Sequence, residues 1–139
     1  MLIERGIKRG VNLGGWLSQC DYSEDRLNNF IKESDIEKIA SWGLDHVRIP
    51  VDYNVVENED GTYKPEGFER LQKAFGWCKK NGLKVVLDLH KTKGYSFDKG
   101  EQQTGFFDDE ALQERFMLLW EEFARSFGSM HEIGRASCR

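Results

Sequence analysis

The sequence predicts an α/β fold in which parallel strands alternate with helices. Stretches typical of strands and of helices alternate three times along the 139 residues, which is the order of consecutive βα units. Both turns that lead from a helix to the next strand are short and contain a glycine, Gly43 and Gly82. The stretch 83–90 has a nearly continuous apolar middle, which is typical of a parallel strand covered on both faces.

The first unit begins with a short strand at residues 9–13, which ends at a pair of glycines. A polar loop continues to about residue 29. Ser34 and Glu37 are spaced as a capping box, so a helix is expected to begin there. Gly43 is expected to end it in the left-handed conformation. The apolar residues of this helix that we expect to be buried are Ile36, Ile39 and Ala40.

The second unit begins with a strand at residues 44–50, in which Arg48 lies on the face opposite to its two apolar neighbours. Pro50 has no amide hydrogen to donate and is expected to end the strand. Pro65 suits the first turn of the next helix, and Gly82 is expected to end that helix. Spacings of three and four place one apolar face on it: Phe68, Leu71, Phe75 and Cys78.

The third unit consists of the strand 83–90, a long loop at 91–107 and a helix at about 108–127. Acidic residues at the start of that helix favour its N-terminus. Its apolar stripe is Leu112, Phe116, Leu119, Trp120, Phe123 and Phe127. The loops that follow the strands are long, polar and aromatic, whereas the turns that precede them are minimal. This asymmetry favours the first three βα units of a truncated (β/α)8 barrel over a doubly wound sheet.

Composition excludes several classes of function. The formal net charge is −4 with scattered Lys and Arg, which disfavours nucleic acid as a partner. No apolar run is long enough to span a bilayer. The N-terminus has no secretory signal, so a cytoplasmic location is expected if Met1 is the true start. Cys20, Cys78 and Cys138 form neither a zinc pattern nor a disulfide framework, and Cys78 is expected to be a buried thiol. We expect no cofactor, and the oligomeric state is open.

The last residues differ from the rest of the chain. Residues 133–139, Ile-Gly-Arg-Ala-Ser-Cys-Arg, have no hydrophobic period and resemble an in-frame translation of a sequencing adapter. We therefore assign residues 1–132 to a partial catalytic domain and 133–139 to a non-native tail, with a natural frayed terminus as the alternative.

Polar and aromatic residues at or near the strand ends are candidates for a site. Arg48 lies within a buried strand and needs a carboxylate partner, either in an active site or in a structural salt bridge. His90 closes the third strand and is either a core residue, a site residue or, with Asp88, a metal ligand. Asp52 is a candidate for binding a polar ligand or for stabilising its loop. The aromatic rings that are candidates for sugar platforms, or for ordinary packing, are Trp16 and Tyr95.

Three stretches together resemble glycoside hydrolase family 5 of the glucanase kind. They are residues 10–17 (Gly-Val-Asn-Leu-Gly-Gly-Trp-Leu), residues 45–51 (Asp-His-Val-Arg-Ile-Pro-Val), and residues 85–95 (Val-Val-Leu-Asp-Leu-His-Lys-Thr-Lys-Gly-Tyr). They stand in the family's order and spacing, and the resemblance covers about residues 7–127. Lys93 stands where many relatives have proline.

The resemblance implies retaining hydrolysis of O-glycosyl bonds in a β-glucan polysaccharide or oligosaccharide. Two glutamates with carboxyl groups about 5–5.5 Å apart carry out such a reaction. By resemblance, Arg48 lies beside the nucleophile and keeps it ionised, and His90 lines the subsite of the attacked sugar. We find neither glutamate here, since Glu101, Asp108 and Glu110 match no catalytic position. These 139 residues alone are therefore expected to be inactive.

Two alternatives stay open. One is a small, complete α/β domain that binds a carbohydrate or another ligand without catalysis. The other is a different barrel enzyme, in which Asp88 and His90 bind a metal. The linkage cleaved and endo or exo action are not predictable from these residues.

Overall fold

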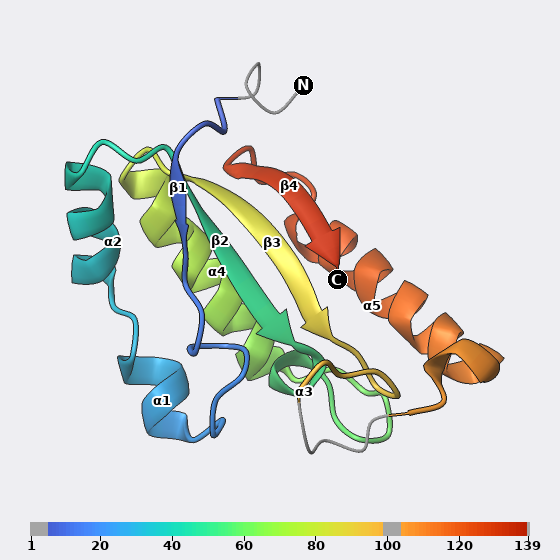
Figure 1. Ribbon diagram of the computed structural model, residues 1–139. Helices are drawn as coiled ribbons and strands as arrows, with labels where there is room; N and C mark the ends of the chain where they lie inside the picture. The colour runs from blue at the N-terminus through green and yellow to red at the C-terminus, as the bar shows by residue number, and fades with distance from the viewer. Residues whose placement is uncertain (1–5, 99–103, 139) are drawn as a thin grey trace.

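The structure is a computed structural model that describes residues 6–98 and 104–138. Its centre is a four-stranded sheet with the order β1-β2-β3-β4, in which every neighbouring pair is parallel. The arrowheads of all strands point the same way in Figure 1, so the carboxyl ends of the strands share one edge of the sheet. The strands are β1 (Gly10–Asn12), β2 (His46–Asp52), β3 (Lys84–Lys91) and β4 (Ile133–Cys138).

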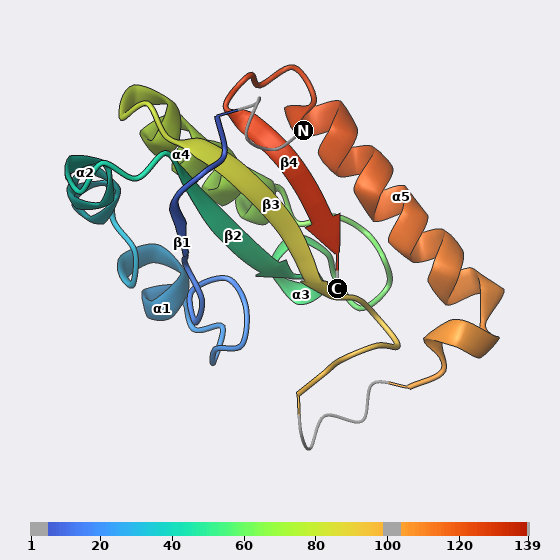
Figure 2. The same ribbon diagram turned by 45° about the horizontal axis from the view of Figure 1, so that its top comes forward.

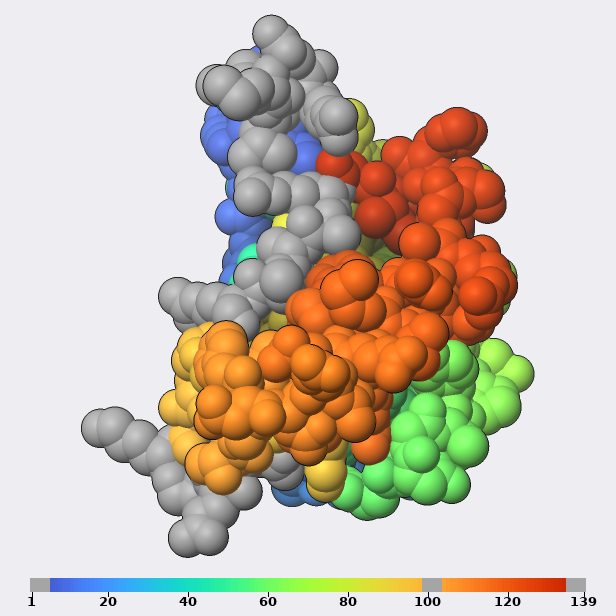
Figure 3. Space-filling view, turned by 90° about the vertical axis from the view of Figure 1, so that its right-hand side faces the viewer, coloured from blue at the N-terminus to red at the C-terminus, as the bar shows by residue number. Residues whose placement is uncertain are grey.

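In the view of Figure 1, one long helix, α4 (Pro65–Lys80), lies behind the sheet, and the other two lie at its left, α2 (Glu33–Ser41), and at its right, α5 (Glu110–Phe127). Helix α5 runs alongside β4 in Figures 1 and 2 and covers much of the face shown in Figure 3. The shorter elements are α1 (Glu24–Asn29), α3 (Tyr53–Val56) and the 3-10 turn η1 (Phe106–Asp108). Within the described ranges, no helix combines the length and apolarity that crossing a bilayer requires.

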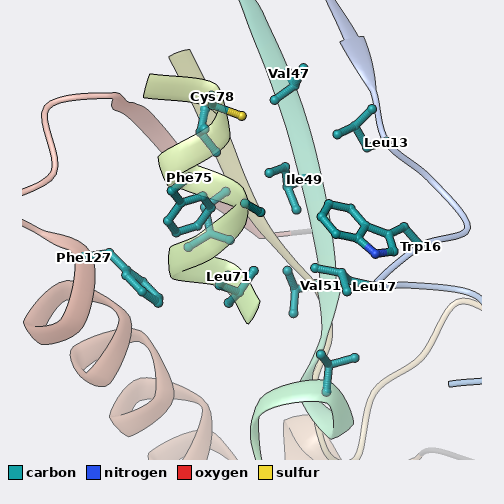
Figure 4. Packing of buried hydrophobic residues seen from close by; sticks show 14 of the residues in the cluster. Leu13, Trp16, Leu17, Val47, Ile49, Val51, Leu71, Phe75, Cys78 and Phe127 are labelled. Carbon is teal, nitrogen blue, oxygen red and sulfur yellow. The ribbon is translucent and has the colours of Figure 1, made fainter. Parts of the chain in front are cut away.

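The core lies between the sheet and these helices, as the apolar spacing predicts. Figure 4 shows the apolar face of α4 turned toward β2. Phe75 of α4 is fully buried, and its ring lies 5.0 Å from the ring of Phe127 in α5. The apolar side chains of β2 that face this layer are each 0% exposed: Val47, Ile49 and Val51. The two faces of β2 are therefore divided as predicted, with Arg48 on the other side of the strand.

The helix ends follow the predicted chemistry with one difference. Gly43 and Gly82 have φ angles of 74° and 69°, so both end a helix in the left-handed region as predicted. Pro65 is the first residue of α4. Helix α2, however, begins one residue earlier than Ser34, and the side chain of Asp35 accepts the amide of Lys32 at 2.8 Å. The predicted Ser34–Glu37 capping box is therefore wrong, because Ser34 already lies inside the first turn.

Strand β2 continues two residues past Pro50, contrary to the prediction. The Arg48 carbonyl, on the β1 side of β2, accepts the Leu13 amide at 2.9 Å, and the Asp52 amide on the same side donates to the Leu17 carbonyl at 2.9 Å. Because the backbone groups of alternate residues point the same way, the nitrogen of Pro50 also faces this side. It falls between those two bonds, beyond the last residue of β1, where the ladder needs no donor.

Four of the described elements were not predicted. The polar loop before residue 29 contains α1, α3 follows β2 directly, and η1 lies at the end of the predicted loop 91–107. Residues 133–138 form β4 and pair in parallel with β3, although they have no hydrophobic period. The sheet thus has a fourth strand where the sequence predicts three and a tail outside the fold. Pairing of the backbone is independent of the origin of these residues, so the adapter hypothesis stays a prediction.

Candidate active site

A row of polar side chains crosses the face of the sheet opposite to α4. The Nη2 atom of Arg48 lies 2.6 Å from Oδ2 of Asp88, and Nδ1 of His90 lies 3.0 Å from the same oxygen. Arg48 also donates from Nη1 to the side-chain oxygen of Asn12 at 2.5 Å. The row therefore connects β1, β2 and β3 through side chains, in addition to the backbone ladder.

The alternation of the strands explains why these residues meet. Arg48 pairs in register with Asn12 of β1 and with Val86 of β3, so Asp88 stands two residues further along β3. Residues two apart in a strand share a face, which places Asp88 and His90 together. The Asp88 side chain is 2% exposed and the Arg48 side chain 29% exposed. The carboxylate is thus a buried anchor, and the guanidinium reaches from it toward the surface.

A β-bulge interrupts the ladder at His90. Val51 pairs with Leu89, but the next residue, Asp52, pairs with Lys91, so His90 has no partner in the register with β2. Bulges add twist and re-aim a side chain, and they are common beside active sites. The His90 side chain is 8% exposed and lies against Asp88.

Asp52 is part of a second polar cluster and not of the row. It is 0% exposed, and its Oδ2 atom accepts the hydroxyl of Tyr22 at 2.5 Å and the amide of Gln19 at 2.8 Å. The Nζ atom of Lys91 lies 3.6 Å from the same oxygen. The structure therefore supports the loop-stabilising role of Asp52 and offers no exposed carboxylate for a substrate. The sequence signal for this cluster is a charged residue, Lys91, directly after a buried strand.

Trp16 also differs from the prediction of a sugar platform. The residue is 1% exposed, and its indole Nε1 donates to the carbonyl of Leu27 at 2.8 Å. Figure 4 shows the ring beside Leu17, among the buried side chains. The reason is α1, which was not predicted and which packs over the ring. Trp16 is therefore a core residue in this structure.

Tyr95 lies in an aromatic cluster in the loop after β3. Its ring is half-buried and makes edge contacts with Phe97 at 4.9 Å and with Phe107 at 5.5 Å. Phe97 is 45% exposed and its ring lies 6.1 Å from that of His90. The cluster thus offers partly exposed aromatic surface beside the row, and Tyr95 stays a candidate for contact with a sugar. Phe97 was missed, although it stands two residues from Tyr95.

The acidic residues that the sequence analysis considered outside the row lie apart from it wherever the structure describes them. Asp108 and Glu110 are exposed around the start of α5, and Glu101 lies outside the described residues. Glu57 is buried, and its carboxylate accepts Nε of Arg115 at 2.8 Å. Burial raises the pKa of Glu57, and the hydrogen bond from Arg115 opposes that rise. In the described part of the chain, no three His, Cys, Asp or Glu side chains are grouped as a metal site.

An apolar hollow lies away from this row. It has a volume of about 150 Å³ and lies between α5 and the sheet. Its lining contains no charged side chain that would orient a polar ligand: Leu87, Trp120, Phe123, Ala124, Phe127, Gly128 and Ile133. Because binding a sugar requires hydrogen-bonding groups, the row Arg48–Asp88–His90 is the better candidate site.

Comparisons of the sequence with known proteins agree on one family. The sequence model of the cellulase family (glycosyl hydrolase family 5) matches residues 9–135. Cellodextrinase A of Ruminococcus flavefaciens is 59% identical over 128 residues, which cover 92% of this chain and 38% of that protein. Endoglucanase C of Acetivibrio thermocellus is 42% identical over 123 residues, which cover 86% of this chain and 36% of that protein. The chain thus spans little more than a third of the length of these relatives.

Solved structures show the same architecture. A crystal structure of a glycoside hydrolase superposes with a TM-score of 0.78 at 23% identity, covering 94% of this chain and 39% of that one. A family 5 xyloglucanase from Paenibacillus pabuli superposes with a TM-score of 0.71 at 22% identity, covering 92% of this chain and 37% of that one. These likenesses confirm the predicted fold class, in which the parallel sheet and its helices are part of a (β/α)8 barrel. The chain belongs to the cellulase family, glycosyl hydrolase family 5.

Proposed function

We propose that the protein to which this chain belongs hydrolyses O-glycosyl bonds of a β-glucan polysaccharide or oligosaccharide with retention of configuration. The observation that carries the proposal is the row Arg48–Asp88–His90 on the polar face of the sheet. Barrel enzymes place their active sites at the carboxyl ends of the strands, toward which this row extends. The names of the two relatives, a cellodextrinase and an endoglucanase, support the substrate class.

In this proposal Arg48 acts through its charge. Asp88 binds Nη2 and Asn12 binds Nη1 of the guanidinium, and the N–H groups of Arg48 outside these two bonds are available to a second carboxylate, the nucleophilic glutamate. A cation beside that carboxylate favours its ionised form, which is the form that attacks the sugar. Asp88 is thus a positioning residue, and Arg48 touches the reacting group.

His90 acts on the sugar that is attacked. Its Nδ1 atom is occupied by Asp88. The opposite ring nitrogen, Nε2, is left to contact a hydroxyl group of the substrate. Phe97 and Tyr95 supply the apolar surface that packs against a sugar ring. Neither catalytic glutamate is among the candidates in these 139 residues, so the proposal places both in other strands of the barrel.

The experiment restores the rest of a barrel and measures hydrolysis. Residues 9–132 replace the matched segment of cellodextrinase A, and the chimera is assayed for reducing sugar released from cellotetraose. The chimera is expected to hydrolyse the substrate. Loss of a group that stabilises developing charge costs about 100-fold in kcat or more, and Arg48→Met is expected to show a loss of that order. His90→Ala is also expected to lower kcat/KM.

The control is Arg125→Met, which removes an arginine whose side chain is 70% exposed on α5. It is expected to change the rate by less than about twofold, as for surface substitutions generally. A folded chimera without hydrolytic activity contradicts the proposal. If the 139-residue chain binds cellotetraose in solution while the chimera is inactive, the non-catalytic binding domain becomes the better reading.

A further inference from the structure

Two consecutive side chains at the end of β3 reach carboxylates on the same face of the sheet. His90 contacts Asp88, and Lys91 contacts Asp52. Asp88 pairs with Arg48, and Asp52 follows Arg48 by four residues in β2, so both carboxylates lie on the polar face. In a regular strand, consecutive side chains point to opposite faces. Lys91 would then point away from Asp52, toward the helices.

The bulge at His90 removes this conflict. Because His90 is the extra residue between the pairs Val51–Leu89 and Asp52–Lys91, the alternation restarts at Lys91. The orientation of the imidazole and the contact between Lys91 and Asp52 therefore depend on the same irregularity. If the ladder were regular, one of the two contacts would be lost.

Lys91 is buried, which makes its contacts energetically demanding. The residue is 4% exposed, and its ammonium group lies 2.5 Å from Oδ2 of Asp98 and 3.6 Å from Oδ2 of Asp52. It also donates to the hydroxyl of Tyr22 at 3.1 Å. A buried charge is tolerated only when it is paired, so the ammonium group holds these partners close to the end of β3. The hydrogen bond from Lys91 also lowers the pKa of Asp98.

The loop between β1 and α1 is part of the same cluster. Gln19 and Tyr22 have φ angles of 53° and 54°, a region that residues with side chains seldom adopt. Both donate to Oδ2 of Asp52. Burial, together with the hydrogen bond to Asp52, raises the pKa of Tyr22, so its hydroxyl stays protonated as a donor. The backbone strain in this loop is therefore offset by bonds to the carboxylate that Lys91 neutralises.

We propose that Lys91 is a positioning residue that maintains the β-bulge and thereby holds the His90 imidazole on Asp88. The placement of His90 follows from the geometry alone, whereas its consequence for a sugar rests on the proposed function. Lys91 itself is directed at Asp52 and Asp98 and acts only through its neighbour.

The alternative is that Lys91 contributes to stability without affecting His90. The proposal and this alternative predict different states of the His90 ring. A ring held on Asp88 donates from Nδ1, so the neutral form is the Nδ1–H tautomer with a protected proton. A purely structural Lys91 would leave that tautomer unchanged when it is replaced.

The experiment uses the 139-residue chain labelled with ¹⁵N and reads the tautomer of His90 from its ring nitrogen shifts. The signals are assigned by their loss in His90→Gln. The wild-type chain is expected to show the Nδ1–H tautomer. Lys91→Met is expected to lose this preference and the slowly exchanging Nδ1–H proton, whereas Lys91→Arg keeps a cation and is expected to retain both.

The matched control is Lys93→Met. Lys93 lies two residues after Lys91, in the loop that follows β3, and its partner, Glu59, is exposed, with a side chain that is 73% accessible. The substitution removes a nearby lysine without touching Asp52 or Asp98. It is expected to leave the His90 signals unchanged.

A second variant decides the matter if Lys91→Met fails to fold cooperatively. Tyr22→Phe removes the hydroxyl that bridges Lys91 and Asp52 while it leaves the charges in place. It is expected to raise the exchange rate of the His90 Nδ1–H proton at least tenfold. Absence of the Nδ1–H tautomer in the wild-type chain overturns the proposal. The proposal is also overturned if a folded Lys91→Met chain keeps the tautomer and the slow Nδ1–H exchange of His90. If Lys91→Met does not fold, unchanged exchange in Tyr22→Phe overturns it.

Failure of the proposed function gives a different result. In that case the chimera with cellodextrinase A is inactive on cellotetraose, but the tautomer still depends on Lys91. Conversely, an active chimera with an unchanged His90 ring in Lys91→Met removes Lys91 from the site and leaves the hydrolase in place.

Discussion

Arg48 and His90 are bound to a single oxygen atom: Nη2 of the arginine and Nδ1 of the histidine lie 2.6 and 3.0 Å from Oδ2 of Asp88. A shared acceptor ties the positions of the two side chains to each other. If Asp88 moves, the cation and the imidazole move together. The spacing between the proposed contacts to the nucleophile and to the sugar is therefore set by one buried carboxylate.

Replacing Asp88 by asparagine keeps the size of the side chain and removes its charge. Arg48 then lies partly buried without its anion, and loss of one partner of a buried pair costs about 3–5 kcal/mol. Because Arg48 is 29% exposed, we expect a smaller decrease, about 2 kcal/mol in the free energy of unfolding. Urea denaturation measures it. Asp108→Asn, at an exposed position, is the control, and an equal effect of both variants would refute the anchoring role.

Phe75 of α4 packs against α5, and a single substitution can remove its ring from this interface. It is 0% exposed and packs edge-on against Phe127. Truncation of a buried phenylalanine costs about 3–5 kcal/mol, so Phe75→Ala is expected to lower the free energy of unfolding by that amount. Phe107→Ala removes the same side chain where it is 73% exposed and is expected to cost less than about 0.5 kcal/mol. Thermal unfolding of both variants tests the difference.

Gly10 leaves room for the ring of His46. A Cβ atom at Gly10 would lie 2.4 Å from Nε2 of His46, so the imidazole must shift away from Asp45, with which its Nδ1 is in contact at 2.6 Å. Gly10→Ala is expected to cost about 1–3 kcal/mol, the usual range for overpacking. In the background of His46→Ala the same change should be close to neutral. Equal costs in both backgrounds would show that the ring is not the obstacle.

Asp45 makes the free energy of unfolding depend on pH in the acidic range. Partial burial raises its pKa, but hydrogen bonds from His46 and from the amides of Lys8 and Arg9 outweigh this and bring the pKa to about 2, from 3.8. A lowered folded-state pKa means that its stabilisation is complete above about pH 4 and is lost as the pH falls toward 2. The free energy of unfolding, measured between pH 5 and 2, should therefore fall less steeply with decreasing pH in Asp45→Asn than in the wild type.

Cys78 is expected to be unreactive until the chain unfolds. The residue is 0% exposed, and burial raises the pKa of its thiol to about 12. Thiolates rather than thiols react with alkylating reagents, so modification at pH 8 should be negligible in the folded state. Mass spectrometry after iodoacetamide treatment, with and without urea, distinguishes the two states. Rapid native alkylation of Cys78 would contradict the core packing.

The long helices were the most predictable part of the fold. The spacing of Leu71, Phe75 and Cys78 is enough to orient α4, because a helix keeps its period whatever it packs against. The C-terminal ends of α2 and α4 at glycine were also predictable, because the left-handed conformation of a glycine depends on local sequence. The start of α2 was not, since Ser34 and Asp35 are both good caps and only the backbone position of Lys32 decides between them.

Residues that depend on contacts distant in sequence were harder to predict. The sequence left Trp16 as a sugar platform or a packing residue, and the hydrogen bond to Leu27 of α1 decides for packing. It left Asp52 as a ligand-binding or a loop-stabilising residue, and the contact with Lys91 favours the second role. The pairing of Arg48 with a carboxylate was predictable, because a buried cation requires one. That the carboxylate is Asp88, shared with His90, follows only from the register of β2 and β3.

The position of Pro50 has a consequence for the side of β2 that faces β1. Between the contacts of β2 with Leu13 and Leu17, a proline presents no amide hydrogen. A foreign strand that paired with β2 along this side would lose a bond there, because proline has no donor to offer. Proline at an open strand edge disfavours pairing with other chains, so Pro50 disfavours mispairing on this side of β2.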